Sequence, residues 1–370
     1  MKKRTRTILL IIIGVLVCLF FLGSRNFEKD KETLLLLKSK AGNGEIKYVL
    51  DELEETESLS NPLINIAYQK WKTKMYERFI TKEEAIENIS GNKVIDDISN
   101  IYRDYWRTEL LKDASDIRTD SLLYHKLADY LLSHSLTKLS KDSLQQTIKN
   151  DVELKRIIEK EGFSAKFMYR DGLQDLILWD RALSETYEVY LPKDTITTTV
   201  KFIENYVLNG YDDYSTFGSS QVGGWAEKES ATLYCNMNEY DLASERFKIS
   251  YLKHESLHFT DLNDYPNLSS ADLEYRAKLI ELMFCSEATI YDRVAQFLNG
   301  ANSENRSYAH AYANYSVINN LSQIIFKSEY VSNYNQWQQL SVEEINNAAL
   351  ILYNRSESIL QNDKSLSEVI

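Results

Sequence analysis

Apolar residues recur at helical spacing through residues 92–161, a stretch that contains neither Gly nor Pro. In two parts of this stretch apolar side chains return every three or four positions: Ile101, Tyr105, Leu110 and Leu111, then Tyr124, Leu127 and Leu131. This periodicity predicts amphipathic helices. The dipeptide Glu161-Gly162 is typical of a helix C-terminus, because Gly readily adopts the left-handed conformation found there. We therefore expect a helical region over residues 30–161.

Glycine and strand-forming residues concentrate in the middle of the chain. Half of the 12 Gly residues fall between Gly162 and Gly224. Four runs rich in β-branched and aromatic residues lie in this segment and predict strands at 166–169, 175–179, 185–191 and 195–202. Beyond Pro266 the chain has one Gly, Gly300, and no Pro, so helices are expected again. A helical region, then a mostly antiparallel sheet, then helices indicate an α+β fold.

The first residues follow a different pattern. Residues 8–23 are apolar without interruption, and four basic residues precede them. This combination is typical of a signal anchor or a secretory signal peptide. We expect a single membrane anchor within 1–29 and the bulk of the chain on the extracytoplasmic side, in the periplasm or at the cell surface. A cleaved signal, which would give a secreted protein, and a lipidated Cys18 are the alternatives. The helical region then covers 30–161, and a second domain covers 162–370.

Composition narrows the classes of function. The chain of 370 residues is 44% hydrophobic and 12% aromatic, which is ample for a sizeable core. Its formal charge of −12 argues against a nucleic-acid partner, since phosphate binding needs a basic face. Three Cys residues are too few for a disulfide scaffold. Cys235 and Cys285 either pair in an oxidising compartment or are two separately buried thiols.

The candidate chemistry lies at residues 253–258, KHESLH, which contain an HExxH motif. The preceding residues 242–251 include no helix breaker, and apolar positions surround the whole circumference, as in a buried helix. On a helix His254 and His258 share one face, one turn apart, so both imidazoles can bind one metal ion. Glu255 points about 100° away, where its carboxylate can act on a water at the metal.

A catalytic zinc ion needs a third protein ligand and an open position for water. Ser269 and Asp272 form an S-x-x-D capping signature, which predicts a second helix over residues 270–298. Glu274 lies in the first turn of this helix, and the small Ala277 one turn later allows close packing against the first helix. Glu274 is therefore our third predicted ligand.

Three other acidic residues compete with this assignment. Asp261 and Asp264 would suit an aspartate-type site, but they lie in the expected loop after the motif. Glu281 lies two turns beyond Glu274 on the same face of the second helix. It is better placed to accept the N–H of a ligating histidine and so to fix the tautomer of that ring.

At these residues the chain resembles the zincin metallopeptidases, specifically the gluzincin-like group that pairs HExxH with a glutamate on the next helix. The segment 223–281 is also similar to a set of bacterial proteins identified as candidate peptidases; the similar stretches are GGWAEKESATLYC, YDLASERFKISYLKHESLHF and DLEYRAKLIEL. The NExxSD pattern of the best-known gluzincins is absent, and Lys278 stands where an acidic residue often supports a histidine. The resemblance implies a zincin-like domain. It also implies that the strand before the zinc helix, at 231–235, lies at the sheet edge and binds extended peptide by strand addition.

Together these features predict a zinc-dependent hydrolase, a metallopeptidase acting on peptide or protein substrates. Zn²⁺ would be held by His254, His258 and Glu274. Glu255 would take the proton of the attacking water and deliver it to the leaving amine.

A donor to the oxyanion is expected from the SYAHAYANY segment on a later helix. His310 is our candidate catalytic residue there, and Tyr308 or Tyr312 could serve instead. A different class of function is also open. The chain could be an exported helical binding or scaffold protein whose metal site is structural or inactive.

Overall fold

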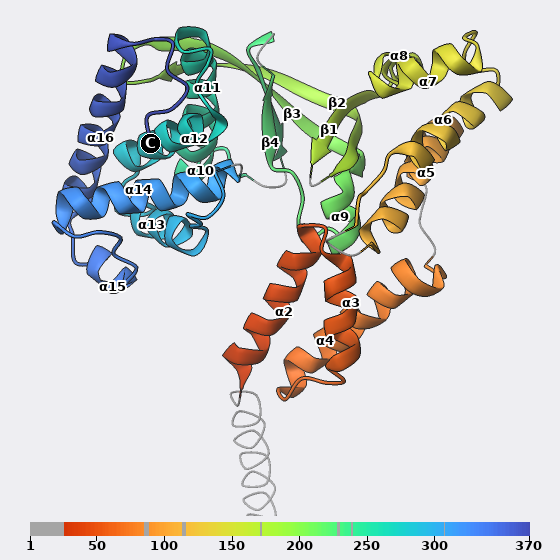
Figure 1. The fold of residues 1–370 in the computed structure, drawn as a ribbon, viewed down its shortest axis with the longest axis horizontal. Helices are drawn as coiled ribbons and strands as arrows, with labels where there is room; N and C mark the ends of the chain where they lie inside the picture. The colour runs from red at the N-terminus through yellow and green to blue at the C-terminus, as the bar shows by residue number, and fades with distance from the viewer. Residues whose placement is uncertain are drawn as a thin grey trace, which may run out of the picture. The chain divides into compact units, whose positions relative to one another are not determined.

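The structure is a computed structural model that describes residues 26–84, 89–112, 116–170, 172–227, 230–237, 240–306 and 308–370. It is a mixed α/β fold with one mostly antiparallel sheet of five strands, in the order β1-β2-β3-β5-β4 (Figure 1). The chain divides into two compact units. Unit 1 comprises the residues up to Arg181 together with Asn205–Val222, and unit 2 comprises Ala182–Glu204 together with Gly223–Ile370. The expected division at 161/162 is thus replaced by units that share the strands β2 and β3.

Unit 1 is mainly helical, as the periodicity of residues 92–161 predicts. Its elements are α2 (Phe27–Gly42), α3 (Ile46–Glu55), α4 (Pro62–Tyr76), the π-helical η1 (Glu77–Thr81), α5 (Lys93–Leu110), α6 (Ser121–Ser133), α7 (Lys141–Lys149), α8 (Val152–Lys160), β1 (Ser164–Arg170) and α9 (Gly210–Thr216). Asn92 caps α5 by accepting from the N–H groups of Val94 and Ile95. After α8, Gly162 has φ +87, the left-handed conformation expected at this helix end.

The four predicted runs lie in three strands, because 175–179 and 185–191 belong to one continuous strand. β1 pairs antiparallel with β2 (Leu173–Tyr190), from Ser164 opposite Trp179 to Arg170 opposite Leu173. β3 (Thr195–Asn209) follows β2 after a short turn and pairs parallel with β5 (Thr232–Asn236). β4 (Gly224–Glu227) pairs antiparallel with β5. Gly224 is required there, because a Cβ would lie 2.4 Å from the backbone oxygen of Tyr234.

Unit 2 places a helical layer after β5. Its helices are α10 (Glu245–Phe247), the π-helical η4 (Lys248–Lys253), α11 (His254–Asp264), α12 (Ser270–Phe284), α13 (Ile290–Asn299), α14 (Ala309–Ile325), α15 (Tyr334–Trp337) and α16 (Val342–Asn362). α12 is buried on nearly all sides, with α11, α14 and α16 packed around it (Figure 1). The capping signature is confirmed, because the Ser269 hydroxyl accepts from the N–H of Asp272. α12 is therefore the central helix of the unit 2 core.

The predicted helix over 270–298 is interrupted. α12 ends at Phe284, and Cys285 has extended backbone angles, φ −64 and ψ 137. Tertiary hydrogen bonds hold this break: the Glu245 carboxylate accepts from the N–H of Ser286 at 3.1 Å, and Asn346 donates to the Cys285 carbonyl at 3.3 Å. No local sequence pattern could indicate these partners.

The predicted position of the edge strand is wrong. The strand before the motif helix, β5, lies inside the sheet between β3 and β4, so its backbone groups already have partners on both sides. The short β4 occupies the edge instead. The strand that the resemblance implied at 231–235 is present, as β5 (Thr232–Asn236), but its position in the sheet depends on its pairing with the distant β3.

The two buried cysteines confirm the second of the alternatives considered for them. Cys235 and Cys285 are both free thiols and buried. Cys235 belongs to the apolar cluster on the sheet, and Cys285 belongs to the cluster around α12.

The expectation of a membrane-anchored, extracytoplasmic chain is corrected. The segment that carried it, residues 8–23, lies outside the described residues. In the part of the chain that the structure describes, no helix combines the length and the apolarity needed to cross a membrane. α16 has 21 residues, but charged side chains such as Glu343, Arg355 and Glu357 interrupt it.

Candidate metal centre

The HExxH residues lie on the first two turns of α11. His254 opens the helix and is 5% exposed, and His258 follows one turn later, largely covered. The centroids of the two rings are 5.0 Å apart and their planes are perpendicular. The π-helical turn η4 comes immediately before His254, and its residues Tyr251 and Leu252 pack on the sheet. This packing fixes the start of α11 and therefore the position of both rings.

Glu274 reaches the two histidines from the first turns of α12. Its Oε2 lies 3.3 Å from Nε2 of His254, and its Oε1 lies 3.4 Å from Nε2 of His258. Ala277, fully buried one turn later, lets the two helices approach closely. The structure therefore brings together the three side chains that the sequence analysis selected as ligands.

The geometry of this group fits a divalent cation. Ligand atoms of His254, His258 and Glu274 all lie within 4.8 Å of one another. Two ligands held about 2.0–2.1 Å from a tetrahedral zinc ion lie roughly 3.3–3.4 Å apart, and each histidine Nε2 lies at this distance from one of the two oxygens of Glu274. Oε2 of Glu274 is buried, and its described contacts are with the cationic nitrogens of His254, His310 and Lys278, so the carboxylate is held as an anion. The donor set, two imidazoles and a carboxylate, is one that zinc accepts.

A second carboxylate supports the first histidine. Nδ1 of His254 donates to Oε1 of Glu281 at 2.8 Å, which leaves Nε2 free to face Glu274. The other oxygen of Glu281 pairs with Nε of Arg293 at 3.0 Å, and Arg293 also donates to the Ser250 hydroxyl at 2.5 Å. Glu281 thus makes the contact that its sequence position predicted. Its carboxylate binds Nδ1 of His254 and so fixes the orientation of the ring.

These buried charges perturb each other's ionisation. Burial alone would lower the pKa of His254, but the facing carboxylates of Glu274 and Glu281 raise it to about 10. Burial alone would raise the pKa of Glu274, but His254, with hydrogen bonds from His258 and His310, holds it well below its usual range. Without a metal ion, the group is therefore a compact cluster of ion pairs.

Two further side chains touch the ligand carboxylate. Nδ1 of His310, on α14, lies 2.8 Å from Oε2 of Glu274, and its side chain is 75% exposed. Nζ of Lys278 lies 3.8 Å from the same oxygen, on a side chain only 8% exposed. His310 therefore lies on the solvent-exposed side of the Glu274 carboxylate, and Lys278 lies on its buried side. Sequence analysis indicated His310 but gave Lys278 no role.

Glu255 differs from its neighbours because it has no described partner. Its side chain is half-buried, and its carboxylate makes no hydrogen bond or ion pair with any described residue. Every other carboxylate at the centre is paired. A free carboxylate beside the predicted ligands is what proton transfer to and from a water requires.

The rival ligands are occupied elsewhere. The buried Asp261 accepts two hydrogen bonds from Arg276, at 2.7 and 2.9 Å, and Asp264 lies 3.7 Å from Nζ of Lys193. Arg276 is fully buried and also pairs with Glu357 of α16 at 2.8 Å. Sequence reasoning missed Arg276, because no local pattern marks a buried ion pair between three helices.

Comparisons of this chain with protein-family models, with curated proteins and with solved structures found no match.

Proposed function

We propose that this protein is a zinc-dependent hydrolase, a gluzincin-like metallopeptidase that cleaves peptide bonds. The observation that carries the proposal is the convergence of His254, His258 and Glu274 on one point, with the unpaired Glu255 beside them. Among the described residues this group has three members, which leaves a fourth position of a tetrahedral ion for water or substrate.

Each residue then has a definite task. Zinc, when bound, would polarise a scissile carbonyl and lower the pKa of a water molecule toward neutrality. Glu255 takes the proton that the attacking water loses and delivers it to the leaving amine. Glu281 holds His254 in the tautomer that presents Nε2. His310, exposed beside Glu274, donates to the oxyanion that develops on the substrate.

The fold around the centre supports a zincin-like domain. Residues of η4 pack against Val200, Phe202 and Leu233 of the sheet, so the helical run that leads into the motif lies on a sheet face. The edge strand β4 contacts α11. An exposed edge beside the motif helix could bind an extended peptide through its backbone groups, which suits a peptide substrate.

The test is the Glu255→Gln variant of the full chain. We expect the variant to bind zinc with the wild-type stoichiometry, because Glu255 is not a ligand, and to lose at least ~100-fold in peptide turnover, because Gln cannot accept a proton. Metal analysis by mass spectrometry and a peptide-library assay measure the two quantities. Glu287→Gln, at an exposed position outside the centre, is the matched control.

One observation favours a second candidate, a binding or scaffold protein with a structural site. Glu274 is paired with three imidazoles even without an ion, so the cluster could serve only to hold α11, α12 and α14 together. That alternative predicts the reverse pattern. His254→Ala and His258→Ala would destabilise the protein strongly, and Glu255→Gln would match wild type in every assay.

A further inference from the structure

A polar pocket lies in unit 2, and none of the metal-centre side chains line it. It has a volume of about 500 Å³ and is formed by α12, α14, α16 and the C-terminal residues Val369 and Ile370. A pocket of this size can hold a ligand of small-molecule dimensions. The pocket is therefore a site separate from the metal-centre side chains.

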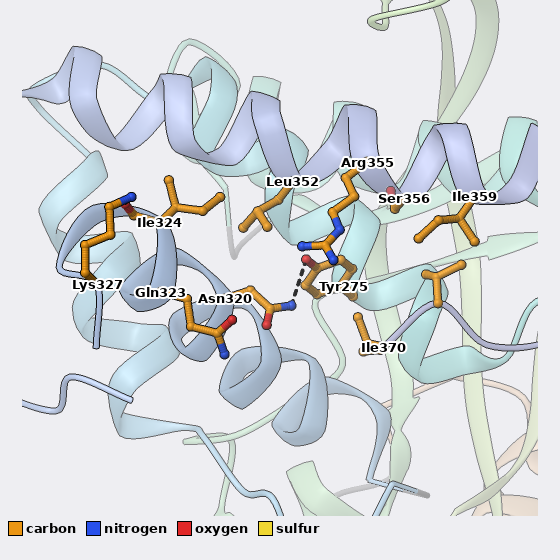
Figure 2. A pocket seen from close by; sticks show the side chains of 11 residues that line it. Tyr275, Asn320, Gln323, Ile324, Lys327, Leu352, Arg355, Ser356, Ile359 and Ile370 are labelled. Carbon is orange, nitrogen blue, oxygen red and sulfur yellow. Dashed lines mark hydrogen bonds between the residues drawn. The ribbon is translucent and has the colours of Figure 1, made fainter. Parts of the chain in front are cut away.

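Donor groups converge on one part of this pocket. Figure 2 shows Arg355 of α16 and Asn320 of α14 reaching toward the hydroxyl of Tyr275 on α12. Asn320 donates to the Tyr275 hydroxyl at 3.1 Å. The phenolic proton of Tyr275 has no acceptor among the described residues, so it is available to a ligand. Tyr275 is only 3% exposed, so its packed ring fixes the position of the hydroxyl oxygen at the pocket.

The pocket is positively charged within an acidic protein. Arg355 and Lys327 line it, no Asp or Glu side chain does, and the chain as a whole carries a formal charge of −12. Arg355 forms no hydrogen bond or ion pair with any described residue. One anion is in the lining, the terminal carboxylate of Ile370, and it accepts from Arg306, a cation outside the lining, at 2.7 Å. The guanidinium of Arg355 is therefore an unused, planar donor for an anion.

Apolar side chains complete the lining. Leu352 and Ile359 of α16 and Ile324 of α14 flank the donors (Figure 2). Such a surface favours a ligand with an apolar body, because burying it removes hydrocarbon from water. A free inorganic ion would leave that surface exposed.

We propose that this pocket binds a monocarboxylate with an apolar body. Its carboxylate accepts from Arg355 and from the hydroxyl of Tyr275, and its apolar part lies against Leu352 and Ile359. Two sources share this chemistry: a fatty acid, and the C-terminal residue of a peptide.

The experiment is isothermal titration calorimetry on the full chain with four probes. Octanoate and N-acetyl-leucine carry both a carboxylate and an apolar body, 1-octanol lacks the charge, and acetate lacks the body. We expect octanoate or N-acetyl-leucine to bind at least ~10-fold more tightly than 1-octanol and acetate, the range expected for a hydrogen-bonded charge. The tighter of the two indicates whether a fatty acid or a peptide end is the better source. The proposal is overturned if neither octanoate nor N-acetyl-leucine binds more tightly than both 1-octanol and acetate.

Two variants locate the binding. Arg355→Gln should weaken the tighter anion by about 10-fold or more, and Tyr275→Phe, which keeps the packed ring, by about 3- to 10-fold. Lys248→Gln removes an exposed cation outside the pocket and should leave the affinity unchanged. Wild-type affinity in the Arg355→Gln variant would overturn the assignment, as would an equal loss in all three variants.

Discussion

At the scale of single residues, the metal centre depends on a carboxylate shared by several donors. The carboxylate of Glu274 forms ion pairs with His254 and His258 of α11, with His310 of α14 and with Lys278 of its own helix. A carboxylate buried among so many cationic groups stays ionised, and an ionised carboxylate is the form that binds a metal. Glu274 is therefore the residue that distinguishes the proposed ligand set from an aspartate-type site.

Replacing Glu274 by Gln should weaken zinc binding by at least about tenfold, because the amide keeps the shape of the side chain but loses the anionic ligand. Competitive titration of the full chain with a chromophoric chelator measures the affinity. Asp261→Asn should retain zinc more strongly than Glu274→Gln, since Asp261 is engaged by Arg276. The opposite order, with zinc lost in Asp261→Asn and kept in Glu274→Gln, would show that the ligand set is wrong.

A second residue-scale prediction concerns Asp151, which precedes α8 with φ 59 and makes no capping hydrogen bond. Burial raises its pKa from 3.8 to about 6, so the folded protein holds this proton more tightly than the unfolded chain does. The ionised carboxylate therefore costs stability, and that cost develops as the pH rises from about 4 through 6. Asn tolerates the same backbone conformation and cannot ionise.

We expect Asp151→Asn to stabilise the protein by about 1 kcal/mol at pH 8, a modest value because the carboxylate is partly in water. Below pH 4 the two proteins should be equally stable, because Asp151 is then protonated in both states. Urea unfolding at pH 4 and pH 8 gives the two differences. A gain of the same size at both pH values would mean that ionisation is not its cause.

Sequence reasoning found the residues that local patterns mark, and it missed the residues whose partners lie in distant segments. The grouping of His254, His258 and Glu274 could be predicted, because helical spacing and a capping signature bring these three side chains together. Arg276 and Arg293 could not, because each acts on a partner that the fold brings near from a distant segment.

At the scale of elements, α11, α12 and α16 are joined by one buried cation. Arg276 of α12 donates to Asp261 of α11, and to Glu357, Ser356 and Tyr353 of α16. The guanidinium is fully buried and satisfied by these groups. The network lies two turns beyond His254 on α11 and close to Glu274 on α12, so it fixes the two ligand-bearing helices against each other.

Arg276→Met should destabilise unit 2 by about 3–5 kcal/mol, because it leaves Asp261 and Glu357 buried without their partner. Hydrogen exchange in α12, followed across a series of urea concentrations, measures this loss. Arg246→Met, at an exposed position before η4, is the control and should have little effect. Unchanged protection of α12 in Arg276→Met would mean that the ion pairs do not stabilise the helix packing.

At the scale of the whole molecule, the order of helices, sheet and helices could be predicted, and the assembly of the sheet could not. Each strand from β1 to β3 appears in the sequence as a local run with turn residues around it. The parallel pairing of β3 with β5 joins segments far apart in the chain, and it leaves β4, which pairs with the neighbouring β5, at the edge. Both units contain part of β2 and part of β3. The composition of the chain does not show this division, so a boundary drawn from composition at 161/162 differs from the one in the structure.

The last prediction follows from the placement of the metal centre entirely within unit 2. An ion that binds only the folded centre stabilises it by mass action, about 2.7 kcal/mol when its free concentration is 100 times the dissociation constant. Amide exchange should therefore slow in α11 and α12, whose side chains would hold the ion, and should stay unchanged in α5 and α6 of unit 1. Hydrogen-exchange mass spectrometry of the full chain, with zinc and with a chelator, measures both regions. His258→Ala, which removes one ligand, should abolish the difference. If zinc slowed exchange in α5 and α6 as much as in α11 and α12, binding at His254, His258 and Glu274 would not be the source of the stabilisation.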